Sequence, residues 1–407
     1  MEQKKLPLFN LAVIVGALGY FVDVYDLLLF SIVRKPSLLS LGLSAEDVAR
    51  QGASIISLQM IGLLIGGIVW GILGDKLGRL KVLFASIILY SLGSIANGFV
   101  HTVDQYAWVR FVTGLGLAGE LGAGITLVSE LMPKERRGLA TSLVAGIGLS
   151  GAVFAYFINI QFDWRTCYFI GGGLGFLLLF LRVGVLESGM YKGIEDKNVK
   201  RGNFFMLLNN GKRLKKYLTA ILIALPNWYV IGILITFSDK FAGLMNVQGT
   251  VNPGKGIMVA YAAISIGDVL IGFISQWFRS RKKSLWLFHI ITVFAVLWYF
   301  NLQGQSSTMM YWVCVLLGFG TGFWAMFVTM AAEQFGTNIR ATVATTVPNM
   351  ARGSLSLVVL PIFEVLQKSQ GYFKAGWITG IIVFAIAFIA LALTEETFHK
   401  DLDYIEA

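Results

Sequence analysis

The sequence predicts an all-α polytopic membrane protein, and three observations lead to that class. Hydrophobic residues make up 56% of the 407 residues, and the mean hydropathy is +0.71. Charged residues make up only 14%, whereas a soluble domain carries about 25%. The 46 Gly and 30 Phe suit the close helix approach and lipid-facing packing of transmembrane helices. These observations exclude a water-soluble fold.

Twelve apolar stretches are long enough to cross a bilayer, which takes about 20 helical residues. They are 9–33, 52–74, 81–100, 105–131, 137–160, 166–187, 217–241, 256–279, 284–302, 309–333, 341–367 and 372–393. The N-terminal MEQKKLPLFN is basic and superficially resembles the start of a signal peptide. The length of the apolar run and its two Asp predict a retained first span instead. An even number of spans places both termini on one side.

Basic residues predict which side that is. They cluster in short connections on the side of the termini: KERRG (134–138), KRLKK (212–216) and RSRKK (279–283). Cytoplasmic loops carry such an excess of Lys and Arg, so we expect both termini to be cytoplasmic. The small extramembrane mass suggests a bacterial inner membrane. The same distribution explains the net charge of +10 without nucleic-acid binding.

An internal repeat divides the chain. SELMPKERRGLATSL (129–143) ends span four and begins span five, and AEQFGTNIRATVATT (332–346) occupies the same place between spans ten and eleven. Glu130 and Glu333 are 203 residues apart, as are Arg137 and Arg340. We therefore expect two pseudo-symmetric six-helix bundles, 1–187 and 217–407, joined by a cytoplasmic linker loop, 188–216. This is the plan of a secondary transporter whose binding site lies between the repeats.

Three motifs resemble those of a known family. GILGDKLGRLKVL (71–83) resembles the loop signature of the major facilitator superfamily, and RFVTGLGLAGELGAG (110–124) resembles its span-four signature. The run from this signature to KERRG is similar to the metabolite:proton symporter branch. YFVDVYDLLLF (20–30) is similar to span one of the phosphate and aromatic-acid:proton symporters. The resemblance covers the whole chain and implies the major facilitator fold with transport by alternating access.

Four charged residues in the spans of the first half are candidates for proton coupling: Asp23, Asp26, Arg110 and Glu120. A charge at the bilayer centre costs about 3 kcal/mol on insertion scales, so such residues are kept for a function. Asp26 and Arg110 lie at similar depth and are expected to form an ion pair. Asp23 and Glu120 lie near the bilayer middle. Which acid takes up a proton is left open by the sequence. The resemblance supports a coupling role for Arg110.

Arg352 is the candidate substrate residue of the second half. It lies near mid-membrane in span eleven beside Asn349, and Asp268 lies at comparable depth in span eight. Two interpretations stay open: a neutral Arg352–Asp268 pair, or a guanidinium that binds a carboxylate or phosphate. An Arg in this helix also resembles one in organic-anion transporters of the superfamily. Further candidate substrate contacts are Asn227, Tyr229 and Trp324.

Seven residues at the cytoplasmic ends of the spans are candidates for gating: Asp75, Gly78, Arg79, Glu130, Arg137, Glu333 and Arg340. Asp75 can pair with basic groups or a helix N-terminus of the other half when the outside is open. The two Glu and the other Arg are expected to form ion pairs that tie helix ends together. These pairs are either purely structural or break when the gate opens.

The predicted function is proton-coupled symport of a small organic anion, acting as a monomer. An antiporter or exporter of cationic or amphipathic compounds is the alternative. A membrane-embedded enzyme or receptor is a third possibility, but the chain has no nucleophile–base set and no soluble segment above about 30 residues. Two scattered Cys and three scattered His give no metal spacing. We therefore expect no metal and no cofactor, with protons as the coupling ion.

Overall fold

The computed structural model describes residues 10–133, 136–182 and 202–406. Twelve helical segments in these ranges are long and apolar enough to span a membrane, which confirms the predicted class and number of spans. They are Leu11–Ser40, Ser54–Leu77, Arg79–Gly98, Val103–Leu131, Arg137–Gln161, Trp164–Leu181, Gly211–Ile235, Pro253–Phe278, Arg281–Phe300, Ser307–Glu333, Arg340–Gln370 and Tyr372–Leu393. The predicted bounds differ by a few residues, most of all at the first helix, which continues to Ser40.

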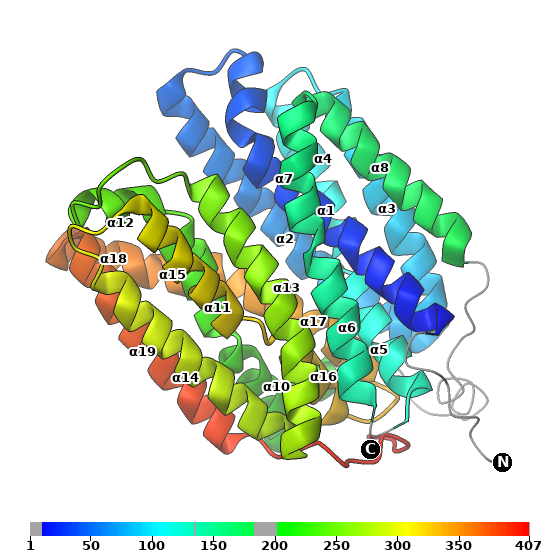
Figure 1. Ribbon diagram of the computed structural model, residues 1–407. Helices are drawn as coiled ribbons and strands as arrows, with labels where there is room; N and C mark the ends of the chain where they lie inside the picture. The colour runs from blue at the N-terminus through cyan, green and yellow to red at the C-terminus, as the bar shows by residue number, and fades with distance from the viewer. Residues whose placement is uncertain (1–9, 134–135, 183–201, 407) are drawn as a thin grey trace.

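The twelve spans form two bundles (Figure 1). The N-terminal bundle, blue to teal, contains α1 (Leu11–Ser40), α2 (Ala45–Leu77), α3 (Arg79–Gly98), α4 (Val103–Leu117), α5 (Glu120–Leu131), α6 (Arg137–Leu149), α7 (Gly151–Gln161) and α8 (Trp164–Leu181). The C-terminal bundle, green to red, contains α10 (Gly211–Ile223), α11 (Leu225–Tyr229), the π-helix η3 (Val230–Ile235), α12 (Ser238–Leu244), α13 (Pro253–Phe278), α14 (Arg281–Phe300), α15 (Ser307–Gly320), α16 (Trp324–Glu333), α17 (Arg340–Ser354), the π-helix η4 (Leu355–Val359), α18 (Leu360–Gln370) and α19 (Tyr372–Leu393).

Most of the predicted linker, up to residue 201, lies outside the described residues. Its described part contains a short 3-10 helix, η2 (Phe204–Leu207), and the start of α10.

Several spans are interrupted inside the bundle. Ala118 and Gly119 separate α4 from α5, and residues 321–323 separate α15 from α16 at the equivalent place in the other half. Irregular backbone at membrane depth is tolerated where protein rather than lipid surrounds it. These breaks place Glu120 and Trp324 at the first residue of a new helix. Discontinuous helices of this kind border the binding sites of many transporters.

Both ends of the described chain lie at one end of the bundles, which we call the C-terminal face. The Asn10 amide donates to the Met132 sulfur at 3.2 Å, just after α5. The Thr337 backbone N–H, just before α17, donates to the Tyr404 carbonyl at 2.8 Å. The starts of α3, α6, α14 and α17 belong to this face, and the C label marks it in Figure 1.

The C-terminal segment, residues 394–406, crosses this face. The Leu402 carbonyl accepts hydrogen bonds from Arg340 and from the Thr337 hydroxyl. Asn338 and Glu406 exchange two hydrogen bonds, at 3.0 and 2.9 Å. The segment therefore fixes the loop that precedes α17.

Glu396 ties the same segment to the start of α14. Its carboxylate accepts hydrogen bonds from the Ser280 hydroxyl and from the Arg281 backbone N–H. Partial burial by itself would raise the pKa of this carboxyl. Hydrogen bonds from Ser280 and from the backbone of Arg281, Thr397 and Phe398 outweigh burial and hold the pKa below its usual range. The carboxylate thus caps α14 in its charged form.

We predict a pH-dependent stability contribution from Glu396. Because its folded pKa is depressed, the contribution is present above the unfolded Glu pKa of about 4.3 and is lost as the pH falls through the folded pKa. Glu396→Gln should lower the melting temperature in detergent at about pH 7, and the difference from the parent protein should shrink in acid. The control is Glu395→Gln, whose side chain is 67% exposed and forms an ion pair with Lys216 at 3.5 Å. A constant melting difference at all pH values would contradict the cap.

Candidate functional site

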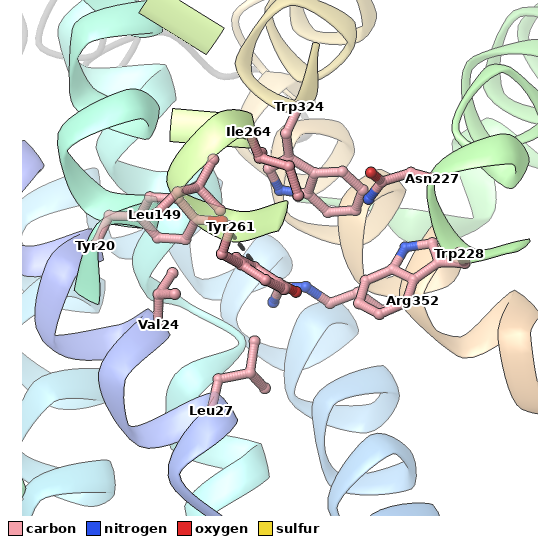
Figure 2. Close-up of a pocket in the computed structure, with 10 residues that line it drawn as sticks. All are labelled: Tyr20, Val24, Leu27, Leu149, Asn227, Trp228, Tyr261, Ile264, Trp324 and Arg352. Carbon is pink, nitrogen blue, oxygen red and sulfur yellow. Dashed lines mark hydrogen bonds between the residues drawn. The ribbon is translucent and has the colours of Figure 1, made fainter. Parts of the chain in front are cut away.

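A small cavity lies between the two bundles. Residues of α1 and α6 line one side, and residues of α11, α13, α16 and α17 line the other (Figure 2). The lining residues are Tyr20, Val24, Leu27, Leu149, Asn227, Trp228, Tyr261, Ile264, Trp324 and Arg352. Three of the predicted substrate residues, Asn227, Trp324 and Arg352, therefore meet in one cavity.

Arg352 is the charged side chain in this lining. Its guanidinium donates to the Asn349 amide oxygen at 3.3 Å and to the Tyr20 hydroxyl at 3.4 Å. Figure 2 shows it reaching from α17 toward Tyr20 on α1. Its guanidinium carbon lies 5.6 Å from the Trp324 ring centroid. The ion pairs formed among the described residues include none to Arg352. The cavity therefore contains a buried guanidinium that has more N–H donors than these two hydrogen bonds use.

Aromatic rings border this cation. The Trp228 and Trp324 rings meet edge to face, with centroids 5.9 Å apart. Both indole N–H groups and the Asn227 amide oxygen are buried without a protein hydrogen-bond partner among the described residues. Buried polar groups of this kind are costly unless a partner is bound. A ligand that accepts from the indole N–H groups and donates to the Asn227 oxygen would satisfy them.

The other predicted substrate residues lie behind the cavity lining. The Asp268 carboxylate accepts from the Ala325 backbone N–H at 3.0 Å, at the start of α16. The Tyr229 hydroxyl donates to the Gly376 carbonyl at 2.8 Å. The Asn349 amide donates to the Ala118 carbonyl at 3.0 Å while its oxygen holds Arg352. These side chains support the lining, and the Arg352–Asp268 pair considered from the sequence is absent from the described ion pairs.

The N-terminal bundle contains the expected ion pair between Asp26 and Arg110. An Arg110 nitrogen lies 2.6 Å from the Asp26 carboxylate, and another donates to the Asp26 carbonyl at 3.0 Å. The third donor, Nε, contacts Gln59 at 3.3 Å. Both charged side chains are buried. Comparing the depths of charged residues along their spans was sufficient to predict this pair. Its role in proton coupling stays a prediction.

Glu120 has a partner that sequence reasoning missed. Arg182, which follows the last residue of α8, forms an ion pair with the Glu120 carboxylate. A second Arg182 nitrogen donates to the Leu83 carbonyl of α3 at 2.8 Å. An Arg at the end of an apolar run has the same sequence pattern as an ordinary flanking cation. Only the fold reveals that this side chain turns into the bundle.

Asp23 differs from the other acids of this bundle. It is 0% exposed, and neither carboxylate oxygen has a hydrogen-bond partner among the described residues. Tyr20, nearly one turn earlier on α1, lines the cavity. Arg352, Glu120, Asp26 and Arg182 all act electrostatically on the Asp23 carboxyl. Asp23 therefore lies between the cavity and the charges of the N-terminal bundle.

Asp75 joins the two bundles at the C-terminal face. Its carboxylate accepts from the backbone N–H groups of Ala341 and Thr342, at 3.0 and 2.8 Å, and from the Thr342 hydroxyl at 2.7 Å. It thereby caps α17 and stabilises the positive end of its dipole. Gly78, at φ 104°, forms the turn between α2 and α3 that keeps Asp75 beside Arg79, 3.4 Å away.

Two pseudo-equivalent ion clusters complete this contact. Glu130 lies 3.0 Å from both Arg79 of its own bundle and Arg340 of the other. Glu333 lies 3.4 Å from Arg281 of its own bundle and 3.6 Å from Arg137 of the other. All seven predicted gating residues gather at this face, together with Arg281, which the sequence did not single out. In this arrangement the C-terminal face is closed by contacts between the bundles.

Fold and site together define a polytopic transporter with a cavity at the interface of two six-helix bundles. A sequence model of the Major Facilitator Superfamily matches residues 16–361, and the chain belongs to that family. As a member of it, the chain is a transporter and not an enzyme. Among the described residues, no group of three or more His, Cys, Asp or Glu could hold a metal ion.

Relatives and solved structures agree with this assignment. The chain is 26% identical to a niacin transporter of Acinetobacter baylyi, over 98% of this chain and 96% of the relative. It is 27% identical to a 4-hydroxybenzoate transporter of Pseudomonas putida, over 56% and 50%. The solved proton:xylose symporter XylE has the same fold, with a TM-score of 0.75 at 16% identity, covering 97% of each chain.

We predict that Asp75→Asn loosens the closed face. One amide oxygen cannot accept from all three donors, and losing such a charged cap costs about 1–2 kcal/mol. The population of protein that is open at the C-terminal face should therefore rise about tenfold.

Maleimide labelling of Thr141→Cys reports this opening, because the Thr141 hydroxyl lies 2.8 Å from that of Thr329 across the bundles. Cys167 and Cys314 are replaced beforehand. The matched control is Gln276→Ala, since Gln276 occupies the equivalent place in the other half. Equal labelling rates in Asp75→Asn and its parent would refute the latch.

A second prediction concerns the Asp26–Arg110 pair. Asp26→Asn leaves the Arg110 guanidinium buried without its partner, and this group cannot lose its proton. We therefore expect the free energy of unfolding to fall by about 3–5 kcal/mol. Arg110→Gln should cost less, because the remaining carboxylate can take up a proton. The double variant should lie closest to the parent protein. Thermal unfolding in detergent measures this order, and an Asp26→Asn variant as stable as the double variant would contradict it.

Proposed function

We propose that this protein is a proton-coupled symporter of small aromatic carboxylates. The observation that carries the proposal is Arg352, a buried cation in the cavity between the bundles, whose hydrogen-bond partners are the neutral Asn349 and Tyr20. A guanidinium binds a carboxylate through paired donors and keeps its charge at any working pH. The cavity is therefore electrostatically suited to an anion.

Two further observations support an aromatic substrate. The Trp228 and Trp324 rings provide flat apolar walls beside the cation, and Asn227 supplies an amide for a ring nitrogen or hydroxyl. The relatives named above transport niacin and 4-hydroxybenzoate, which are planar and small. A cationic substrate, the alternative, is disfavoured because Arg352 is the charged residue of the lining.

Coupling to protons follows from the position of Asp23. Without substrate, the positive charge of Arg352 favours an ionised Asp23 and gives partial compensation for the cost of burying that charge. An anion at Arg352 removes that compensation, and Asp23 is then neutral only with a proton bound. Anion and proton therefore favour each other's binding, which is the linkage a symporter requires.

Alternating access would come from movement of the two bundles about this cavity. The positive-inside distribution supports a cytoplasmic location of the C-terminal face, and the bacterial relatives support a bacterial inner membrane. With that orientation, the contacts at Asp75, Glu130 and Glu333 close the cytoplasmic gate, so the structure corresponds to a state before substrate release.

The first test is uptake of radiolabelled nicotinate into proteoliposomes. We expect an inward proton gradient to stimulate uptake severalfold and a protonophore to abolish the stimulation. Nicotinamide, the neutral amide of the same ring, should compete poorly because it cannot pair with Arg352. Empty liposomes and xylose serve as controls. Uptake that is indifferent to the proton gradient would refute proton coupling.

The second test concerns Arg352 itself. Arg352→Gln should weaken nicotinate binding about 10–100-fold, because a charge-assisted hydrogen bond contributes about 1.5–3 kcal/mol. Arg352→Lys keeps the charge but not the paired donors and should be intermediate. Quenching of tryptophan fluorescence by nicotinate measures binding. The matched control is Arg279→Gln, a change at the C-terminal face outside the cavity. Unchanged nicotinate affinity in Arg352→Gln would refute the anion site.

A further inference from the structure

Five charged side chains lie in the interior of the N-terminal bundle: Asp23, Asp26, Arg110, Glu120 and Arg182. Each is at most 1% exposed. Uncompensated charge in such surroundings is costly. Asp26 pairs with Arg110 and Glu120 pairs with Arg182. The three acids exceed the two cations by one, and Asp23 is the acid that remains without an ion pair.

The Glu120–Arg182 pair is held in place from several helices. Arg182 is anchored on α3 through the Leu83 carbonyl. On α1, a Cβ atom at Gly19 would clash with both the Glu120 carboxylate and the Arg182 guanidinium. Gly19 lies one turn before Asp23, so the absence of a side chain lets the pair pack against α1. The Glu120–Arg182 pair therefore packs against α1 one turn before Asp23.

The other polar groups around Asp23 do not change the excess of one acid over the cations in the interior of the N-terminal bundle. Tyr20 and Asp26 share its helix, the Tyr90 hydroxyl of α3 is buried without a hydrogen-bond partner among the described residues, and Arg352 of α17 donates to Tyr20. Asp268 of α13 belongs to the other bundle, where one of its oxygens accepts from the Ala325 backbone N–H and the other has no hydrogen-bond partner among the described residues.

We propose that Arg182 is a positioning residue that keeps Glu120 ionised and so leaves Asp23 as the exchangeable proton site of the N-terminal bundle. The proposal rests on the symporter function above and adds its stoichiometry. Around the cavity, Asp23, Asp26 and Glu120 are balanced by Arg110, Arg182 and Arg352. One monovalent anion at Arg352 adds one negative charge, which one proton on Asp23 removes. The transporter therefore carries one proton per monovalent carboxylate.

The test is a double-mutant cycle in proteoliposomes with nicotinate as the probe. Arg182→Gln leaves a second unpaired acid, so half-maximal uptake should move to higher pH and the proton:nicotinate ratio should rise above one. Glu120→Gln leaves Arg182 unpaired beside Asp23, so half-maximal uptake should move to lower pH. We expect each shift to be about one pH unit, tenfold in proton concentration. The double variant should restore both the parent pH profile and a ratio of one.

A glycine pair provides a test that leaves every charge in place. Gly19→Ala should displace the ion pair and shift the pH profile, whereas Gly173→Ala, where a Cβ meets nothing within 4 Å, should not. Melting temperature and nicotinate binding are measured for each variant, because a merely structural pair would lower stability without moving the pH profile. Unshifted profiles in folded single variants, or a parent ratio other than one, would overturn the inference. If the parent shows no proton-driven uptake, the proposed function itself fails instead.

Discussion

The structure depends on one constraint: a charge buried away from water must find a partner inside the protein. In the N-terminal bundle this requirement joins Asp26 to Arg110 and Glu120 to Arg182. Each pair links helices that are distant in the sequence, so the ion pairs contribute to the packing of these helices. Asp23 and Arg352 form no ion pair among the described residues. They lie near Tyr20, where the bundles meet.

Helix N-termini serve as the second kind of partner. Asp75 and Asp268 are both buried, and both accept hydrogen bonds from backbone N–H groups, at the starts of α17 and α16. The repeat is not symmetric in this respect. Gln276 stands where Asp75 would be in the second half, and its amide nitrogen has no partner among the described residues. The closing contact through a helix cap therefore belongs to one side of the pseudo-twofold axis, whereas the Glu130 and Glu333 clusters occur on both.

Sequence reasoning succeeded where chemistry follows from depth along a span or from a loop motif. The spans, the Asp26–Arg110 pair and the gathering of the gating residues are of this kind. It failed where a side chain turns back from a helix end, as with Arg182 and Arg281, since a flanking cation and an inward-turning one have the same pattern. It also did not find the partners of Asp268 and Tyr229, because these partners are backbone groups. The cavity residues Tyr20, Trp228 and Tyr261 depend on which helix face turns inward, and that follows from packing.

The same constraint links the site to the gate. If Arg352 and Asp23 compensate each other in the empty protein, the bundles can move past each other without carrying a net charge through the membrane interior. An anion bound without a proton would leave Asp23 ionised and uncompensated, and moving that charge would add a barrier of several kcal/mol. A proton bound without an anion would leave Arg352 uncompensated, with the same effect. The empty protein and the protein with both anion and proton bound are then the two states in which the bundles move readily, and tight coupling needs no residue beyond Arg352 and Asp23. On this argument, coupling arises from the low dielectric of the interior and from the single acid that the ion pairs leave free.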